Sequence, residues 1–195
     1  MQYWWITLAW ASYFFLHSFL ANLSVKNFFY KRFPAFKSTY RLYYNAFATV
    51  TLAWVTYFHF QQTPHFVFEA NWWAKSVSSM LIMSGLWILR LAFKNYDLSE
   101  FAGVQQQQMA QEVHTKLNVQ GMNRYVRHPI YLGALLIFIG IFMFQPTWAN
   151  LILLGVVLCY IFVGAYLEEQ KLIKAYGQLY KDYQKKVKML IPKVL

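Results

Sequence analysis

The sequence predicts an all-α integral membrane protein, and three observations support this class. Of the 195 residues, 58% are hydrophobic and only 13% are charged, whereas a soluble domain has about 25% charged residues. The apolar residues form continuous runs of about one bilayer width, which indicates helices rather than a membrane barrel. The basic residues are concentrated in alternate connections between these runs, as expected for a polytopic protein.

Five apolar runs are predicted as transmembrane helices: Tyr3–Leu20, Tyr43–Phe60, Trp72–Phe93, Pro129–Phe144 and Trp148–Tyr166. After the fifth run, apolar residues recur at three- and four-residue steps from Leu172 to Leu190, with lysines mostly between them. This spacing predicts a C-terminal amphipathic helix on the membrane surface, ended by Ile191 and Pro192. We expect one membrane domain, made of three N-terminal spans (1–96), a cytoplasmic connector (97–124), and a helical hairpin with the amphipathic helix (125–195).

The distribution of charge predicts the orientation in the membrane. The connection after the first run is basic and contains no acidic residue, whereas the connection 61–71 contains no lysine or arginine. The stretch 94–127 and the tail from residue 171 are basic again. The positive-inside rule then places the N-terminus outside and the C-terminus in the cytoplasm. The net charge of +11 therefore favours membrane lipids as partners and not nucleic acid.

The residues before the first apolar run and the single cysteine each bear on one further property of the protein. No positive charge precedes the first apolar run, which favours a retained first helix over a cleaved signal peptide. The single Cys159 lies inside an apolar run, so the sequence predicts neither a disulfide framework nor a cysteine-based metal site. No metal ligand set is predicted.

The polar segment before the fourth run is the strongest candidate for a binding site. Arg127 and His128 directly precede Pro129, a residue that suits the first turn of a helix because it lacks an N–H group. The free amides and the positive dipole end of a helix attract anions. A bound anion would therefore explain cationic side chains at this helix start. The alternative is that Arg127 anchors the helix among lipid headgroups.

Two adjacent acids, Glu168 and Glu169, stand where the fifth run ends. Carboxylates at the edge of an anionic leaflet need a cationic partner. That partner is either Arg124 or Arg127, in a structural ion pair, or the amine of a ligand.

The N-terminal half contains further polar candidates. His17 lies within the first run, where an ionisable residue is a functional candidate by default; the alternative is a helix-end histidine that reaches the headgroups. Arg41 precedes the second run and can snorkel to the surface. The hydrophilic stretch 97–123 is either disordered or functional, and its glutamine run 105–108 favours the former.

Taken together, these residues resemble a known pattern. The motif Gly121-x-x-Arg124-Tyr125-x-Arg127-His128-Pro129-x-Tyr131-x-Gly133, followed by a hairpin, Glu168-Glu169 and later tyrosines, is similar to the cofactor-binding half of the isoprenylcysteine carboxyl methyltransferase superfamily, which includes phospholipid methyltransferases. The N-terminal motifs, with His17-Ser18, Tyr40-Arg41-Leu42 and Phe101-x-Gly103-x-Gln105, look like the branch of NnrU-type proteins, nurim and methanethiol S-methyltransferase.

The resemblance implies S-adenosylmethionine (SAM) as the cofactor. The residue types agree, because Arg127 and His128 can donate to its carboxylate, the glutamates can accept from its ammonium or ribose, and tyrosine rings can face its adenine or sulfonium. No GxGxxG motif follows a strand, which excludes a Rossmann-type site. The implied cofactor contacts are Gln105, Leu117, Gly121, Tyr125, Arg127, His128, Pro129, Ile130, Tyr131, Glu168, Glu169 and Tyr180.

The resemblance also implies a reaction, which is transfer of a methyl group to a small, lipid-soluble acceptor. A thiol has a pKa of about 8.5, so that it needs a base or a positive field, and His17, Arg41 and His128 are the catalytic candidates. Superfamily members that act on isoprenylcysteine carry an arginine about one turn before the paired acids, where this chain has Gly164 and Ala165. We therefore expect thiol S-methylation, with two alternatives: methylation of an isoprenylcysteine carboxylate or a lipid amine, or a non-catalytic protein of the NnrU or nurim type. The oligomeric state is left open.

Overall fold

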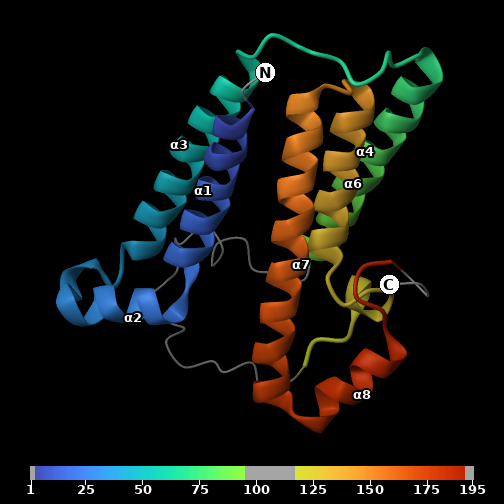
Figure 1. Cartoon of the computed structure of the whole chain (residues 1–195). Helices are drawn as coiled ribbons and strands as arrows, with labels where there is room; N and C mark the ends of the chain where they lie inside the picture. Colours follow the sequence, from blue (N-terminus) through green and yellow to red (C-terminus); the bar gives the residue numbers. More distant parts are fainter. Residues whose placement is uncertain (1–2, 95–116, 192–195) are drawn as a thin grey trace. The chain divides into compact units, whose positions relative to one another are not determined.

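The computed structural model describes residues 3–94 and 117–191, and these residues form seven α-helices and two short 3-10 helices (Figure 1). Backbone contacts divide the chain into two compact units. The first contains Met1–Thr63, and the second contains Pro64–Tyr96 and His114–Leu195. The helical class predicted from the apolar runs is confirmed.

The first unit consists of α1 (Trp4–Ala21), α2 (Leu23–Arg32), η1 (Pro34–Phe36) and α3 (Tyr40–Phe60). Asn22 separates the first two helices, because its extended backbone ends α1 while its side chain accepts a hydrogen bond from the Ser24 amide at 2.8 Å and caps α2. Helix α2 is bent from α1 by 61°. Helices α1 and α3 are joined near the other end of α1, where the Trp10 indole donates to His59 Nδ1 at 3.2 Å.

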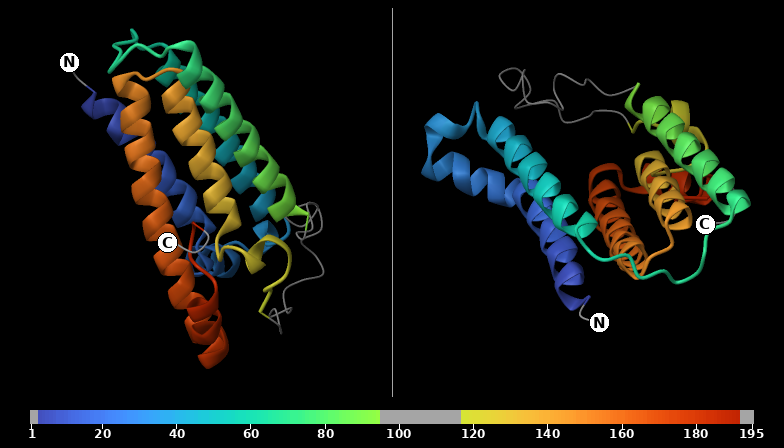
Figure 2. Two further views of the ribbon diagram at one scale, coloured as in Figure 1. Left: turned by 90° about the vertical axis from the view of Figure 1, so that its right-hand side faces the viewer. Right: turned by 90° about the horizontal axis from the view of Figure 1, so that it is seen from above.

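The second unit consists of α4 (Trp72–Phe93), η2 (Gly121–Arg124), α6 (Pro129–Phe144), α7 (Trp148–Tyr176) and α8 (Gln178–Lys186). Helix α6 lies between α4 and α7 (Figures 1 and 2). A tight turn joins α6 to α7, because the Thr147 side chain caps α7 by accepting from the Asn150 amide, and the Asn150 side chain donates to the Gln145 carbonyl at 2.7 Å.

Glycines allow α4 and α6 to pack with their backbones close together, as small residues do in membrane helix pairs. A Cβ atom added at Gly133 would lie 2.9 Å from the Gly85 carbonyl oxygen and 2.8 Å from Leu89 Cγ. A Cβ atom at Gly140 would lie 2.9 Å from the Ser78 carbonyl oxygen. Two of these three neighbours are backbone atoms of the facing helix, which cannot move aside without separating the helices.

Replacing Gly133 with alanine is therefore expected to destabilise the protein by about 1–3 kcal/mol, the usual cost of overpacking. Gly155→Ala is the matched control on α7, because an added Cβ atom there meets nothing within 4 Å. The thermal unfolding midpoint in detergent measures both variants. Equal midpoints would show that α4 and α6 do not depend on this close approach.

The predicted helix boundaries agree with the structure for the third and fourth runs, which coincide with α4 and α6. By length and apolar composition, α4 and α7 can each cross a bilayer, α1 with α2 adds a third candidate if the bent pair is one span, and α6 is a shorter apolar helix. The described residues thus contain two to three candidate membrane spans, in keeping with a multi-pass membrane protein.

Two elements differ from the prediction. Helix α2 lies in a stretch that the sequence analysis treated as a connection, because its mixed residues show no clear period. The C-terminal amphipathic helix is shorter than expected. Residues up to Tyr176 continue α7, Gly177 then breaks the helix with a φ of +57°, and α8 ends at Lys186. Its Tyr180 side chain is buried within the protein and does not face lipid.

Candidate functional site

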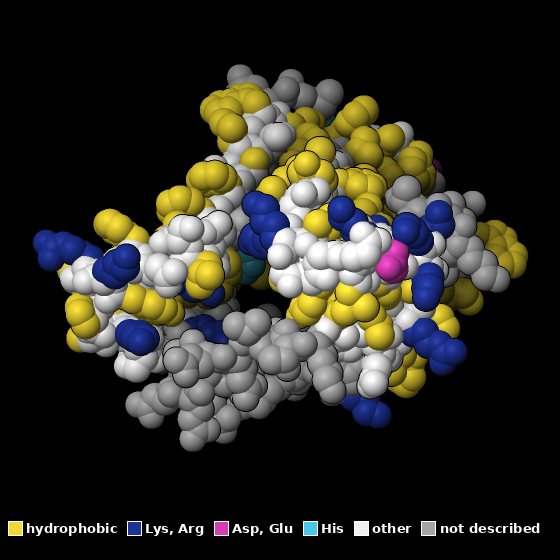
Figure 3. Space-filling model, turned by 90° about the horizontal axis from the view of Figure 1, so that it is seen from below, with side chains coloured by type: hydrophobic (Ala, Val, Ile, Leu, Met, Phe, Trp, Pro, Cys, Tyr) yellow, Lys and Arg dark blue, Asp and Glu magenta, His cyan; other side chains and the backbone are white. Residues whose placement is uncertain are grey.

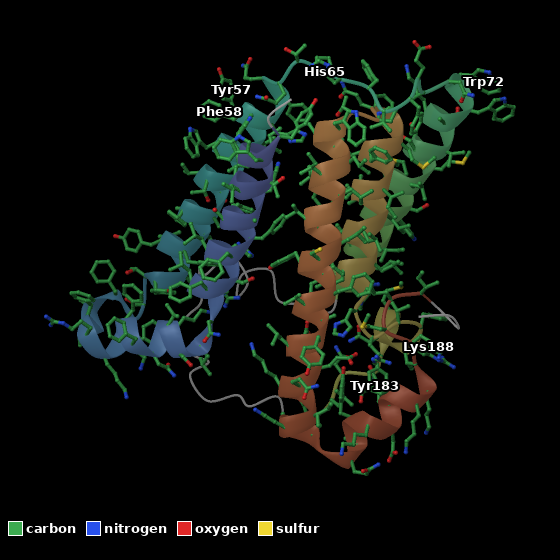
Figure 4. The ribbon with its side chains drawn as sticks, viewed as in Figure 1. Tyr57, Phe58, His65, Trp72, Tyr183 and Lys188 are labelled. Carbon is green, nitrogen blue, oxygen red and sulfur yellow. The ribbon has the colours of Figure 1, made fainter. Side chains whose placement is uncertain are left out.

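The segment before α6 is held in place by the C-terminal segment of the chain. Val126 and Lys188 form a parallel bridge, the Arg127 amide donates to the Lys188 carbonyl at 2.9 Å, and the His128 amide donates to the Met189 carbonyl at 3.1 Å. Tyr183 of α8 also donates from its hydroxyl to the Asn123 carbonyl, and Figure 4 labels Tyr183 and Lys188 in this part of the fold. The motif therefore has a fixed backbone at the start of α6.

Arg127 makes its hydrogen bonds to protein groups. Its Nε atom donates to Glu169 Oε1 at 2.6 Å, and its Nη1 atom donates to the carbonyls of Gln184 (3.2 Å) and Val187. The two carbonyls belong to the last turn of α8 and its C-cap, where a cation is favoured. The Arg127 side chain is only 10% exposed. This geometry joins α7, α8 and the start of α6, and it selects the ion-pair alternative for Arg127.

Glu169 is the centre of this network. Its Oε1 atom accepts from Arg127 and contacts His128 Nε2 at 3.2 Å, and its Oε2 atom accepts from the Gln184 side chain at 2.8 Å. Both carboxylate oxygens are thus occupied by protein donors, and the side chain is 13% exposed.

His128 lies between the two acids as the N-cap of α6, and its side chain is almost fully buried. Its Nδ1 atom is 3.5 Å from Glu168 Oε2, opposite the contact of Nε2 with Glu169. Burial alone would lower the pKa of His128, but the hydrogen bonds with Glu168 and Glu169 and the charges of these carboxylates outweigh burial, so that the pKa is raised above 6.5. The Tyr131 ring stacks on the imidazole at 5.4 Å between centroids.

The raised pKa of His128 predicts how stability depends on pH. Protonated His128 stabilises the folded state. This contribution is fully present below pH 6.5, the ordinary pKa of histidine, and is lost as the pH rises through the higher pKa of the folded state. We expect the thermal midpoint of the wild type to fall more steeply than that of His128→Gln when the pH is raised from 6 to 9. Parallel profiles of the two proteins would contradict a protonated His128.

Glu168 differs from Glu169 in being open. Its side chain is 49% exposed, and its contact with His128 is long. The Tyr131 hydroxyl lies near it, in a space that Gly164 leaves open on α7, since a Cβ atom there would be 3.2 Å from this hydroxyl. The structure therefore leaves one carboxylate of the pair available to a ligand.

A buried tyrosine hydroxyl lies beside this network. Tyr180 is 1% exposed, and its hydroxyl has no hydrogen-bond partner among the described residues. Burial and the negative charge of Glu169 raise its pKa, against the charge of Arg127. Because a buried hydroxyl without a partner is costly, this group is one that a bound polar ligand would satisfy. Neighbouring Tyr183 has its pKa raised to about 12, chiefly by burial.

The remaining predicted cofactor residues surround this cluster in sequence but contribute less to it. Pro129 is the buried first residue of α6, and Ile130 is half-buried. Leu117 is half-buried before η2, Gly121 opens η2 with a φ of +59°, and Tyr125 is 62% exposed. Gln105 lies outside the described residues.

The predicted catalytic residues fall in both units. His128 belongs to the cluster, whereas His17 lies on α1 and Arg41 in the first turn of α3, both in the first unit. The Tyr44 hydroxyl is 3.1 Å from each ring nitrogen of His17. The sequence analysis did not predict Tyr44 as the partner of His17. The signal that was available is the position of Tyr44, one turn after Arg41 on α3.

Gln184 is the other residue that sequence reasoning missed. It is an uncharged amide in a lysine-rich tail, and this contrast with its neighbours is the signal that was available. The described residues contain no group of three or more histidine, cysteine or acidic side chains that is suited to a metal ion. The cluster thus offers the exposed carboxylate of Glu168, the buried His128 and the Tyr180 hydroxyl, which has no hydrogen-bond partner among the described residues. It also offers the start of α6, which no side chain caps. These groups together suit a small ligand that carries one positive and one negative charge.

The polar cluster lies at one end of the apolar helical hairpin of α6 and α7, in keeping with a membrane protein, and comparison with known proteins identifies the class. The chain belongs to the phospholipid methyltransferase family, a family of membrane methyltransferases, whose model matches residues 73–179, more than half of the sequence. This match includes the hairpin, His128, Glu168 and Glu169.

Curated relatives agree with this family. The chain is 46% identical over 71 residues to "Methanethiol S-methyltransferase 1" of Bradyrhizobium diazoefficiens, and 31% identical over 129 residues to "Methanethiol S-methyltransferase" of Crocosphaera subtropica. These matches cover 35% and 65% of this chain, and 24% and 45% of the relatives. The chain thus spans less than half the length of these relatives. No solved structure matches the chain.

Proposed function

We propose that the protein is an integral-membrane enzyme that uses SAM to methylate the sulfur of a small thiol such as methanethiol. The observation that carries this proposal is the unequal pair of acids: Glu169 is saturated by protein donors, whereas Glu168 is open beside the buried His128. The family supports the methyltransferase class, and the names of the relatives support the thiol acceptor.

The residues of the cluster fit SAM by their chemistry. Glu168 supplies a carboxylate for the ammonium group or the ribose hydroxyls. The uncapped amides at the start of α6 suit a carboxylate. The Tyr180 hydroxyl has no hydrogen-bond partner among the described residues, so that it can form a hydrogen bond with the ligand. The Tyr131 ring, already stacked on His128, provides an aromatic face near these groups. We assign the cofactor-binding role to Glu168, and we assign a positioning role to Glu169 and Arg127.

When bound, SAM supplies a methyl group on a positively charged sulfur, which a thiolate can displace in line. The new sulfur–carbon bond forms as the bond to the sulfonium breaks, and the proton of the thiol must leave. His17, with Tyr44 beside it, and Arg41 remain the candidates for the thiol side of the reaction, as a proton acceptor and a positive field.

We also propose the five-span arrangement with the N-terminus outside. It extends the two to three candidate spans by counting α3 and the 16-residue α6. Helix α6 is about 24 Å long, short for a bilayer core of about 30 Å. The polar cluster at its start then lies near the headgroups and not in the core.

The reaction is tested with purified protein, methyl-labelled SAM and separate acceptors: methanethiol, a lipid amine, and a prenylcysteine. We expect label in dimethyl sulfide, detected in the headspace, and less of it after the Glu168→Gln substitution at a SAM concentration that does not saturate the wild type. Label in the lipid amine alone, which the family name makes the second candidate, would refute the thiol acceptor but keep the enzyme class. Failure of the protein to bind S-adenosylhomocysteine would refute both the thiol acceptor and the enzyme class.

A further inference from the structure

The inner part of the candidate site is closed to solvent. Tyr180 of α8 is 1% exposed, and its hydroxyl has no hydrogen-bond partner among the described residues. Glu168, at the rim of the same cluster, has a side chain that is 49% exposed. A ligand can thus reach Glu168 in this arrangement, whereas it cannot reach the Tyr180 hydroxyl. Binding to both groups requires part of the second unit to move.

The helices that carry the rest of the cluster are locked together. A Cβ atom added at Gly85 of α4 would lie 2.6 Å from the Gly133 carbonyl oxygen of α6, so that the two backbones are in close contact. The turn between α6 and α7 is held by the Thr147 cap and by the Asn150 side chain. Helices α4, α6 and α7 therefore form a fixed frame, and α8, which carries Tyr180, is the element that is left to move.

Helix α8 is joined to this frame through one glycine. Gly177 has a φ of +57° and a ψ of −126°, a backbone conformation that is open to glycine and strained for other residues. A Cβ atom added there would meet nothing within 4 Å, so that the joint is not packed on that side. The outer face of α8 is exposed at Lys181, Lys185 and Lys186, and Figure 3 shows Lys and Arg side chains on the face of the molecule seen from below. Helix α8 can thus turn outward about Gly177.

The far end of α8 is fastened to the start of α6. Residues 187–190, which we call the strap, pair with residues 126–128 through the Val126–Lys188 bridge and through two backbone hydrogen bonds of 2.9 and 3.1 Å. Leu190 of the strap is fully buried. The Tyr183 hydroxyl of α8 donates to the Asn123 carbonyl (Figure 4). A free joint at one end and breakable contacts at the other are the parts of a lid.

We propose that α8 and the strap form a lid, which turns outward about Gly177 to admit SAM or S-adenosylhomocysteine and closes with the Tyr180 hydroxyl against the ligand. This inference rests on the proposed function, because it gives the ligand of that site its route of entry. The contacts of the strap, of Tyr183 and of Arg127 all hold the lid closed. The open form is therefore a minor state, and it limits the rate at which the ligand is exchanged.

The motion of the lid is tested first without ligand, by hydrogen exchange of the Arg127 and His128 amides, which donate to the strap. Tyr183→Phe removes the hydroxyl that donates to Asn123 and keeps the ring. We expect this variant to speed exchange of both amides about fivefold, the value of one neutral hydrogen bond, while amides in the middle of α6 keep their wild-type rates. Tyr166→Phe, which removes an exposed hydroxyl from α7, is the matched control and should change neither.

The second measurement is the rate of S-adenosylhomocysteine binding. Tyr183→Phe should raise the association and dissociation rate constants by the same factor and leave the dissociation constant unchanged, because its hydrogen bond closes the lid equally with and without ligand. A disulfide between Val126→Cys and Lys188→Cys, in a Cys159→Ser background, should stop association until a reductant is added. Bridge partners lie about 4.8 Å apart, one strand spacing, which a disulfide can span.

Two results would overturn the lid. One is equal exchange of the Arg127 and His128 amides in the wild type and in Tyr183→Phe. The other is S-adenosylhomocysteine binding that proceeds at the same rate with the disulfide closed and reduced. A protein that does not bind S-adenosylhomocysteine at all would refute the proposed function, and the exchange rates of the two amides would still decide whether α8 and the strap move.

Discussion

Replacing Arg127 with alanine is expected to destabilise the protein by about 3–5 kcal/mol, the usual cost of breaking a buried ion pair. The substitution removes the 2.6 Å contact with Glu169 and both hydrogen bonds to the last carbonyls of the α8 region. It leaves a mostly buried carboxylate without its main partner. Arg127→Lys should recover only part of the loss, because one ammonium group cannot reach the same three acceptors in a fixed fork.

The sequence analysis placed Arg127 among the implied cofactor contacts, and that hypothesis predicts a larger effect of the substitution on cofactor binding than on folding. The thermal midpoint without ligand separates the two hypotheses, and the exposed Arg124→Ala is the control for charge. An unchanged midpoint combined with weaker binding of S-adenosylhomocysteine would restore Arg127 as a ligand for the cofactor carboxylate.

Replacing Glu168 with glutamine is expected to weaken binding of S-adenosylhomocysteine about 10- to 100-fold, the value of a hydrogen bond to a charged group. The thermal midpoint without ligand should change little, because this side chain is 49% exposed and has a long contact with His128. Titration calorimetry measures the affinity, and heat denaturation measures the stability.

Glu169→Gln is the matched comparison, one residue further along the same helix. It should lower the thermal midpoint, because Arg127 and His128 lose the carboxylate that they share. If Glu169→Gln abolished binding while the folded protein stayed intact, and Glu168→Gln did not, the assignment of the two acids would have to be exchanged.

Much of the helical fold is predictable from the sequence, because an apolar run of membrane width permits few other structures. Helices α4 and α6 begin and end where the apolar runs do. Helix α2 was not predictable in this way, since neither its charge nor its apolar residues follow a clear period. The length of α8 depends on Gly177, whose positive φ ends the preceding helix after Tyr176.

The candidate site was predictable as a set of residues but not as a network. The sequence predicted His128 and the paired acids as site residues, and it left open whether an arginine or a ligand is the partner of those acids. The structure pairs Arg127 with Glu169 and leaves Glu168 49% exposed, and a ligand at Glu168 stays a prediction. The backbone pairing of residues 126–128 with residues 188–189 could not be predicted, because such long-range contacts require no periodic pattern of residue types in the sequence.

The most direct measurement is an experimental density map of the protein saturated with S-adenosylhomocysteine. Our account predicts ligand density beside His128, with its amino group or ribose hydroxyls at the Glu168 carboxylate and a hydrogen bond to the Tyr180 hydroxyl. Density at a place remote from these residues, or an Arg127 side chain turned from Glu169 to the ligand carboxylate, would contradict it.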